Sequence, residues 1–268
     1  MPVLPLFQID AFTTHFLEGN PAAVVLLKDG WMSDLTMQRI ARKNNLSETA
    51  FVDLSGEGET LGLRWFTPTV EMDLCGHATL AAAFVLFREE LLEGDKVVFS
   101  TRSGDLHVTR NEHRIQLDFP SRPPKATSSF PALEEALGGV TPQEVHSSER
   151  DLLVILENEE AVRMVRPDFE KLAALDAFAV IVSARGQQVD FVSRFFAPNA
   201  GVPEDPVTGS AHCTLVPYWS KLLRQPRLRA RQLSERGGEL FCEDCGERVK
   251  IAGEAVEYLR GTIQVEDE

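Results

Sequence analysis

The segment Arg64–Pro68, of sequence RWFTP, recurs 130 positions later as Arg194–Pro198, of sequence RFFAP. Each copy is followed by a short glycine-containing loop, which is Cys75–Ala78 (CGHA) in the first copy and Thr208–Ala211 (TGSA) in the second. Similarity at one long, nearly constant spacing is typical of two lobes built to a single plan. Small-molecule sites usually form where such lobes meet, so we expect both loops to face a shared cleft.

Two further segments repeat with nearly the same spacing. Arg102–Leu106 (RSGDL) returns as Arg236–Leu240 (RGGEL), and Arg114–Leu117 (RIQL) returns as Arg248–Ile251 (RVKI). The repeat therefore extends well beyond the two loops and covers most of each predicted lobe.

The chain is long enough for two hydrophobic cores, because it has 268 residues of which 43% are hydrophobic. The repeat predicts a first lobe over residues 1–119 and a second lobe over residues 130–259. A C-terminal strand near residues 260–268 is a candidate addition to the first lobe. The stretch 120–129, rich in Pro, Ser and Thr, is the expected linker.

Each predicted lobe combines several strands with one apolar helix. The helix of the first lobe begins near Gly76 and runs to Leu86, and that of the second lobe covers residues 211–223. Both helices are apolar on nearly every side, which indicates that they are buried all round. The predicted fold is therefore α+β, with two pseudo-symmetric lobes that each curl a mostly antiparallel sheet around a central buried helix.

The charge of the chain excludes some partners. With 27 basic and 41 acidic residues, the net charge of −14 would repel phosphate backbones and anionic membrane surfaces. No stretch reaches the roughly 18 consecutive apolar residues that span a bilayer. The start of the chain does not resemble a secretory signal, and four cysteines in a chain of this length do not suggest a disulfide framework. We expect a cytoplasmic protein that binds neither nucleic acid nor membranes.

The two glycine-containing loops are the candidate functional sites. Each places a glycine, Gly76 or Gly209, where free backbone N–H groups open a helix, and such a terminus favours a carboxylate or a phosphate. Glycine and serine also simply cap helices, and that alternative stays open for either loop taken alone.

Four motifs together resemble the PhzF family of phenazine-biosynthesis-like isomerases, and the resemblance covers nearly the whole chain. The motifs are Asn20–Ala22 (NPA), Asn45–Phe51 (NLSETAF), Cys75–Thr79 (CGHAT) and Glu204–Ala211 (EDPVTGSA). The segments RWFTP and Tyr218–Ser220 make the resemblance strongest to the animal phenazine biosynthesis-like domain-containing proteins. The resemblance implies the diaminopimelate-epimerase-like fold, a homodimer, and proton transfer on a small cyclic or unsaturated carboxylic acid without a metal or an organic cofactor.

The resemblance also implies the roles of individual residues. It places the general acid/base at Glu48, because one sheltered carboxyl group can take a proton from one carbon and return it to another. At the start of a helix, the positive dipole end would lower the pKa of His77 and keep its ring neutral. The implied catalytic residues are Glu48, His77, Asp205 and Ser210, and the implied substrate-binding residues are Asn20, Gly76, Thr208 and Gly209.

Other roles remain open for two of these residues. An arbitrary glutamate is more often a helix cap or a solvated surface residue than an acid/base, and only the motif favours catalysis for Glu48. Asp205 could instead cap the turn before Pro206.

Three other functions compete with this interpretation. Racemases of the same fold use two thiols, but the position equivalent to Cys75 is Thr208, whose hydroxyl is too weakly acidic, so Cys75 is expected to be a packed residue. Cys242 and Cys245 could suggest zinc, but a single such pair without a nearby histidine favours a hairpin with incidental thiols. A catalytically silent protein that acts through protein contacts is the remaining alternative, since fold does not guarantee activity.

Overall fold

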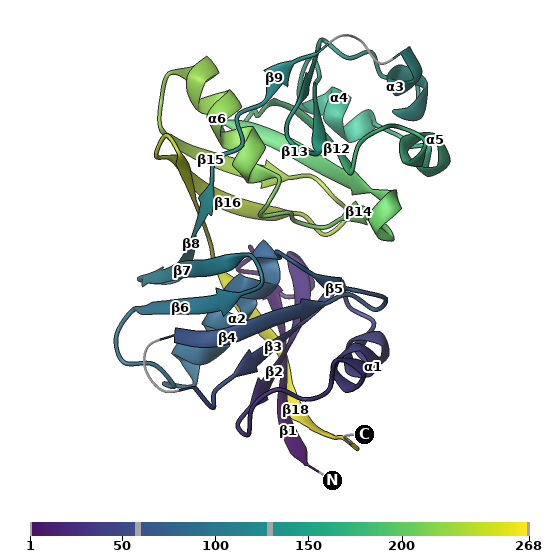
Figure 1. Cartoon of the computed structure of the whole chain (residues 1–268). Coiled ribbons are helices and arrows are strands. Elements are labelled where there is room, and N and C mark those ends of the chain that lie inside the picture. The colour runs from purple at the N-terminus through teal and green to yellow at the C-terminus, as the bar shows by residue number, and fades with distance from the viewer. Residues whose placement is uncertain (1, 57–59, 128–130, 267–268) are drawn as a thin grey trace. The chain divides into compact units, whose positions relative to one another are not determined.

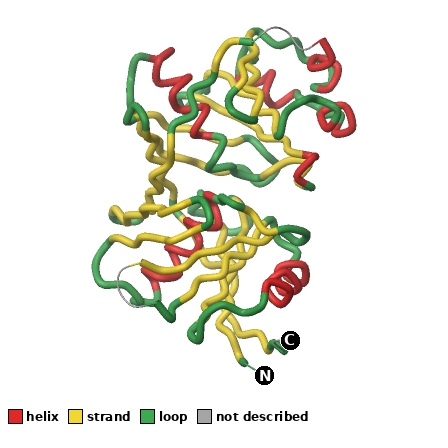
Figure 2. The backbone as a smooth tube through the Cα atoms, viewed as in Figure 1, coloured by secondary structure: helices red, strands yellow, loops and turns green. Residues whose placement is uncertain are grey.

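The computed structural model describes residues 2–56, 60–127 and 131–266. The chain forms two compact units, which we call unit 1 (Met1–Asp118 with Ala252–Glu268) and unit 2 (Phe119–Ile251). Strands outnumber helices in both units (Figure 2). The predicted α+β class is therefore confirmed.

Unit 1 is built on one sheet, in which β18 pairs with β1, followed by β2, β3, β4, β6, β7 and β8, while the short β5 pairs with β4 (Figure 1). The pairs β2–β3 and β4–β6 are parallel, and the other pairs are antiparallel. The elements are β1 (Val3–Ala11), β2 (Asn20–Leu27), α1 (Asp34–Asn44), β3 (Glu48–Asp53), β4 (Thr60–Phe66), β5 (Glu71–Met72), α2 (Gly76–Arg88), β6 (Lys96–Thr101), β7 (Gly104–Asn111), β8 (Arg114–Pro120) and β18 (Ala255–Gln264).

The predicted central helix of the first lobe is α2. It packs against β1, β2 and β3, and all of its residues except Phe84 and Arg88 are buried. Small side chains such as Ala81, Ala82 and Ala83 let the helix lie close to the strands, so its environment explains its alanine-rich sequence. The other helix, α1, begins after Ser33, whose hydroxyl accepts the N–H of Thr36 at 3.1 Å.

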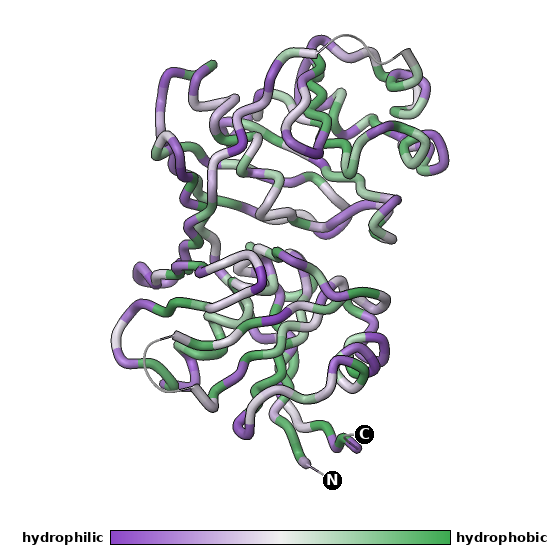
Figure 3. Tube along the Cα trace, in the orientation of Figure 1, coloured by the Kyte–Doolittle hydropathy of each residue, from purple (hydrophilic) through white to green (hydrophobic). Residues whose placement is uncertain are grey.

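Unit 2 repeats this plan. Its elements are β9 (Lys125–Ala126), α3 (Pro131–Ala136), β10 (Glu144–Ser147), β11 (Asp151–Ile155), α4 (Glu159–Met164), α5 (Phe169–Ala173), β12 (Ala179–Arg185), β13 (Phe191–Ala197), the 3-10 helix η1 (Pro198–Ala200), β14 (Val202–Asp205), α6 (His212–Leu223), β15 (Arg227–Gln232), β16 (Gly238–Asp244) and β17 (Arg248–Gly253). The strands β11 and β12 are buried over almost their whole length, and the trace around β12 is largely green, that is hydrophobic, in Figure 3.

The two units match strand by strand. The parallel pair β2–β3, the antiparallel pairs β3–β4 and β4–β5, and the parallel pair β4–β6 correspond to β11–β12, β12–β13, β13–β14 and β13–β15, with the same directions. In each unit the helix that follows the short strand, α2 or α6, occupies the same place in the order of elements. The internal duplication indicated by the sequence is therefore present in the fold.

The repeated Arg-aromatic-Phe segments explain one shared feature of the units. Arg64 forms two hydrogen bonds with Glu71, of 2.7 and 2.8 Å, and Arg194 forms two with Glu204, of 2.8 and 2.9 Å. Each guanidinium also lies over the ring of the phenylalanine two residues later, at 5.2 Å in unit 1 and 5.0 Å in unit 2. The repeat therefore conserves a bidentate ion pair that fixes β5 against β4 and β14 against β13.

A proline inside α6 changes how that helix is held. Pro217 has no N–H, so it cannot bond to the carbonyl of Cys213 one turn earlier. That carbonyl instead accepts the backbone N–H of Arg122 at 2.8 Å. The segment that follows β8 is thereby tied to the first turns of α6.

The C-terminal strand belongs to unit 1. β18 pairs antiparallel with β1 over its whole length, from Val3 opposite Gln264 to Ala11 opposite Ala255. The predicted second lobe ended at residue 259, whereas residues 252–264 extend unit 1, because β18 is a single ten-residue strand. Within the predicted linker, β9 pairs with β10 as part of unit 2. Residues 128–130 and 267–268 of the predicted linker and C-terminal strand lie outside the described residues.

None of the helices in the described part of the chain is long and apolar enough to cross a lipid bilayer.

Candidate functional site

Glu48 is held at the entrance of a buried strand. The helix α1 ends at Asn45, which adopts the left-handed conformation (φ 50°, ψ 39°) and donates its N–H to the carbonyl of Ala41. This turn directs the chain into β3, whose first residue is Glu48, aligned with Ala22 of β2. The side chain is buried, with only 8% of the residue exposed. Glu48 is therefore not the solvated surface residue that its type alone would suggest.

His77 contacts Glu48 directly. It lies in the first turn of α2, is 4% exposed, and places Nε2 at 3.1 Å from Oε2 of Glu48. The ring N–H is not well aimed at this oxygen, and neither atom has a hydrogen-bond partner of good geometry among the described residues. The two groups form a buried ion pair whose polar atoms still have bonding capacity for a ligand.

Cys75 completes the cluster on the other side of the ring. Its Sγ lies 3.5 Å from Nδ1 of His77. Its carbonyl accepts the hydroxyl of Thr79 at 2.5 Å, which fixes the start of α2. The imidazole therefore lies between the thiol and the carboxylate, with one ring nitrogen toward each.

The charge state of His77 differs from the one predicted. Burial lowers the pKa of His77, but Cys75 and Glu48 outweigh burial and raise the pKa well above its ordinary value. Burial also raises the pKa of the Cys75 thiol, so at neutral pH the thiol acts on His77 as a hydrogen-bond partner while Glu48 supplies the negative charge. At an effective dielectric constant of about 20, opposite charges about 3 Å apart attract by about 5 kcal/mol, whereas a helix terminus contributes about 0.3–1 kcal/mol. The expected neutral ring is therefore wrong, because the carboxylate outweighs the helix dipole.

These three residues are also of the types that bind zinc. The donor atoms of Glu48, Cys75 and His77 lie within 4.8 Å of one another, and all three residues are buried. However, Cys75 and Glu48 contact opposite nitrogens of the ring, and a single metal ion could bind only one of these nitrogens. The arrangement therefore fits a chain of hydrogen bonds better than a shared ion.

Two other predicted residues of unit 1 lie at the ends of elements. Asn20 is the fully buried first residue of β2 and is aligned with Ala11 of β1. It follows Gly19, which has φ 73° and lies so close to the carbonyl of Ala11 that a Cβ would approach it to 2.4 Å. Gly76 is the first residue of α2, so its backbone N–H has no acceptor within the helix.

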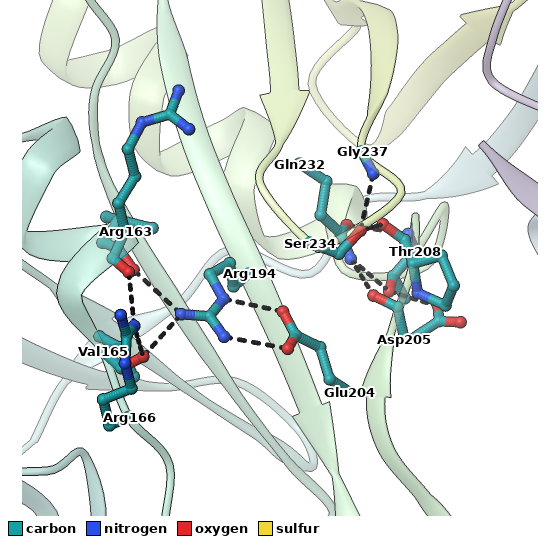
Figure 4. Close-up of polar contacts among 12 residues, drawn as sticks. Arg163, Val165, Arg166, Arg194, Glu204, Asp205, Thr208, Gln232, Ser234 and Gly237 are labelled. Carbon is teal, nitrogen blue, oxygen red and sulfur yellow. Dashed lines mark hydrogen bonds and ion pairs between the residues drawn. The ribbon is translucent and has the colours of Figure 1, made fainter. Parts of the chain in front are cut away.

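The remaining predicted residues belong to unit 2, where Asp205 and Thr208 contact each other. The hydroxyl of Thr208 donates to Oδ2 of Asp205 at 2.5 Å (Figure 4). The amide group of Gln232 accepts the N–H of Thr208 at 2.9 Å and donates to the carbonyl of Asp205 at 2.7 Å. Ser234 adds a bond to the carbonyl of Pro206 at 2.7 Å. Residues at and just after the end of β15 thus fix the loop from Asp205 to Thr208. A direct bond from Thr208 to a substrate stays a prediction.

Ser210 and Gly209 lie in the tight turn before α6. The carbonyl of Gly209 accepts the N–H of His212 at 3.0 Å, and that of Ser210 accepts the N–H of Cys213 at 3.1 Å. The Ser210 side chain is half-buried. His212 is fully buried, and its Nδ1 lies 2.8 Å from the carbonyl of Thr208. The turn is therefore fixed from inside the unit by a histidine.

We expect His212 to make unit 2 sensitive to acid. Burial lowers the pKa of His212 to about 4, from an ordinary value near 6.5. Between these values the unfolded chain binds a proton that the folded chain does not, so stability falls as the pH falls from about 6.5 to about 4. Urea denaturation between pH 7 and pH 4 should show that the wild-type protein loses about 3 kcal/mol more than His212→Asn.

The exposed His107 of β7 provides the matched control for this measurement. His107→Asn should follow the wild-type pH dependence. Equal acid sensitivity of His212→Asn and the wild-type protein would contradict the assignment.

Three contacts in these clusters are poorly indicated by the sequence. Gln232 lies on β15, a strand that was not predicted although it holds the place of β6 in the second copy. His212 follows the TGSA loop directly but has threonine, Thr79, at the equivalent place in the first copy. Cys75 is buried as expected, but its contact with the imidazole was not predicted. All three depend on distances that only the folded chain defines.

The acidic residue of β3 has no equivalent in unit 2. The parallel pair β2–β3 begins with Ala22 opposite Glu48, and the matching pair β11–β12 begins with Asp151 opposite Ala179. Alanine therefore occupies the position of Glu48 in the second copy. The buried pair of Glu48 and His77 therefore has no counterpart at the matching position of unit 2.

The chain is similar to known proteins over nearly its full length. A protein from Pseudomonas aeruginosa named "Uncharacterized isomerase PA3578" is 55% identical, over 98% of this chain and 99% of the relative. The mouse "Phenazine biosynthesis-like domain-containing protein 1" is 41% identical, over 97% of this chain and 99% of the relative. The bacterial protein is thus more similar than the mouse protein, which corrects the expected nearer resemblance to the animal proteins.

Solved structures agree with these relatives. The crystal structure of a PhzF-family phenazine biosynthesis protein from Enterococcus faecalis has a TM-score of 0.94 and 46% identity, and it covers 98% of this chain and 100% of that chain. A hydroxyproline epimerase from Agrobacterium vitis has a TM-score of 0.63 at 9% identity, covering 99% of this chain and 93% of that chain, so the fold alone is shared. The family model described as "PhzC-PhzF: Phenazine biosynthesis-like protein" matches residues 9–261. The chain belongs to the PhzC-PhzF family.

Proposed function

We propose that the protein is an isomerase that moves a proton on a small cyclic or unsaturated carboxylic acid, with Glu48 as the general acid/base. The contact of 3.1 Å between the buried Glu48 and His77 is the observation that carries this proposal. A family relative that is 55% identical is named an isomerase, which supports the same class of reaction. The family's phenazine-related names favour a cyclic, unsaturated substrate.

The proton balance of the reaction can be written with Glu48 alone. The carboxylate takes a proton from one carbon of the substrate, and the electron pair moves along the unsaturated system. The protonated Glu48, whose acidic hydrogen exchanges with solvent, then delivers a proton to another carbon, so no net proton is gained or lost. During this step the positive His77 stabilises negative charge that develops on a substrate oxygen. No metal ion or organic cofactor is needed for this sequence of steps.

We further propose that the other predicted site residues bind and position the substrate. Asp205 and Ser210 would bind and polarise it, and Asn20, Thr208 and the amides near Gly76 and Gly209 would hold its carboxylate. The bonds of Gln232 support this role, because they fix the loop in one conformation and so reduce the entropy lost when substrate binds. Homodimerisation and a cytoplasmic location stay predictions.

The alternatives are less well supported. Two-thiol racemisation would require an acid equivalent to Cys75 in unit 2, and Thr208 at that position has already donated its hydroxyl to Asp205. A silent protein that acts only through protein contacts would have no need for an unmatched buried carboxylate next to a charged histidine, since burying such a pair is costly.

The proposal is tested by isotope incorporation. The wild-type protein is incubated in deuterium oxide with a panel of cyclohexadiene and open-chain unsaturated carboxylic acids, with and without prior treatment with a chelator. We expect deuterium at carbon in at least one cyclic acid, at a rate that chelation does not change. Loss of incorporation after chelation would contradict metal independence, and incorporation no faster than in protein-free solution across the panel would contradict the proposed reaction.

A further inference from the structure

We propose that Cys75 is a positioning residue, whose thiol keeps a hydrogen on Nε2 of His77, on the side where Glu48 lies. This inference rests on the proposed function, because it takes Nε2 to be the ring nitrogen that interacts with Glu48 and the substrate. It is carried by two distances, 3.5 Å from Sγ to Nδ1 and 3.1 Å from Nε2 to Oε2 of Glu48. The three groups thus form a chain in which the imidazole has one neighbour on each nitrogen.

The thiol can satisfy Nδ1 in both charge states of the ring. When His77 is positively charged, Nδ1–H donates to Sγ and Nε2–H points to the side of Glu48. When His77 is neutral, the thiol S–H can donate to Nδ1, which leaves the single ring hydrogen on Nε2. A cysteine that stays protonated can fill both roles, and burial raises the pKa of the Cys75 thiol. The hydrogen on Nε2 is therefore retained throughout the reaction.

The position of Cys75 is itself fixed. Cys75 is the residue before α2, has extended backbone angles (φ −144°, ψ 112°) and makes no side-chain bond that caps the helix. Its carbonyl is fixed by the hydroxyl of Thr79 at 2.5 Å. From this fixed position the sulfur faces the imidazole of His77 at 3.5 Å, and the backbone N–H of Ala78 also acts on it.

The ionisable groups near His77 are few. The strands β1 and β18, which also pack against α2, carry Asp10 and Glu257, but the groups that raise the pKa of the imidazole are Cys75 and Glu48. A change at Cys75 should therefore be visible in the titration of His77.

The experiment is a nitrogen NMR titration of histidine-labelled protein without substrate. The resonances of His77 are identified by their loss in His77→Asn among the six histidines. In Cys75→Ala, Nδ1 loses its partner, so we expect the pKa of His77 to shift downward and the neutral ring to show a mixture of both tautomers. Cys75→Ser retains a donor and an acceptor and should remain nearer to the wild-type protein on both readouts.

Two further variants keep the test decisive. Cys242→Ala removes another buried thiol, on β16 of unit 2, and should leave the titration of His77 unchanged. If Cys75→Ala does not fold, Thr79→Val, which releases the carbonyl of Cys75, should produce a smaller shift in the same direction. A titration and tautomer in Cys75→Ala equal to wild type, or a shift in Cys75→Ser as large as in Cys75→Ala, would overturn the proposal.

The outcome is separable from that of the proposed function. The titration requires no turnover, so a protein that incorporates no deuterium can still show the effect of Cys75 on His77. Conversely, an active enzyme in which the Cys75 variants do not change the titration of His77 would leave the isomerase proposal intact and contradict this one.

Discussion

Glutamine in place of Glu48 is expected to slow deuterium incorporation by about 10²–10⁴-fold, the usual contribution of a general acid/base. Glutamine has nearly the same shape, so it can occupy the start of β3 and still offer an oxygen to His77. It cannot accept a proton from carbon, and the structure places no second carboxylate at the equivalent position of unit 2, where the residue is Ala179. The loss should therefore appear in the rate of the chemical step.

The control for this variant is Glu93→Gln, which changes an exposed acid in the segment between α2 and β6 of the same unit. It should incorporate deuterium at the wild-type rate. Circular dichroism should show that both variants retain the fold. Equal incorporation by Glu48→Gln and the wild-type protein would remove Glu48 from the proposed mechanism and favour the catalytically silent alternative.

Replacing Arg194 by methionine should lower the free energy of unfolding of unit 2 by about 3–5 kcal/mol, as expected when a largely buried ion pair loses one partner. The guanidinium bonds twice to Glu204 and also donates to the carbonyls of Val162 and Val165, at 3.3 and 2.9 Å (Figure 4). Its side chain is only 11% exposed. Without it, Glu204 and the end of α4 lose their shared partner, so the backbone amides of β14 and α4 should both exchange hydrogen faster.

The matched control is Arg163→Met. Arg163 lies on α4 close to the same carbonyls, but its own side chain is 48% exposed and forms a single i,i+4 ion pair with Glu159, so the change should cost less than about 0.5 kcal/mol. Urea denaturation gives the size of the effect, and peptide-resolved hydrogen exchange shows whether β14 and α4 respond together. Similar losses in the two variants would contradict the structural role assigned to Arg194.

The fold could be predicted largely from the sequence because the local sequence patterns that indicate helices and strands occur in both copies of the repeat. The N-cap Ser33, the buried α2 and the paired strands all follow from local patterns, and the two copies support each other. The short strands β5, β14 and β9 were missed because they contain too few residues for periodicity to show. Strand β15 was missed because its alternation of arginine with leucine and alanine is easily taken for an exposed loop.

The candidate site was predictable in composition but not in its interactions. The motif containing Glu48 and the loop containing His77 are separated by about 30 residues. This spacing does not indicate that Oε2 of Glu48 and Nε2 of His77 lie 3.1 Å apart. The charge of His77 was mispredicted for this reason, because the helix dipole is visible in the sequence and the neighbouring carboxylate is not. The bonds of Gln232 to the Asp205–Thr208 loop depend in the same way on a strand that lies far along the chain.

The pairing of β18 with β1 has a consequence for how the protein is made. The final strand of unit 1 is translated last, after all of unit 2, which is one uninterrupted stretch of the chain. On the ribosome, unit 2 can reach its native structure while the nascent N-terminal part still has the outer edge of β1 without a neighbour. An unpaired strand edge can pair with other chains, so synthesis of β18, rather than emergence of the first hundred residues, is the step that protects unit 1 from aggregation.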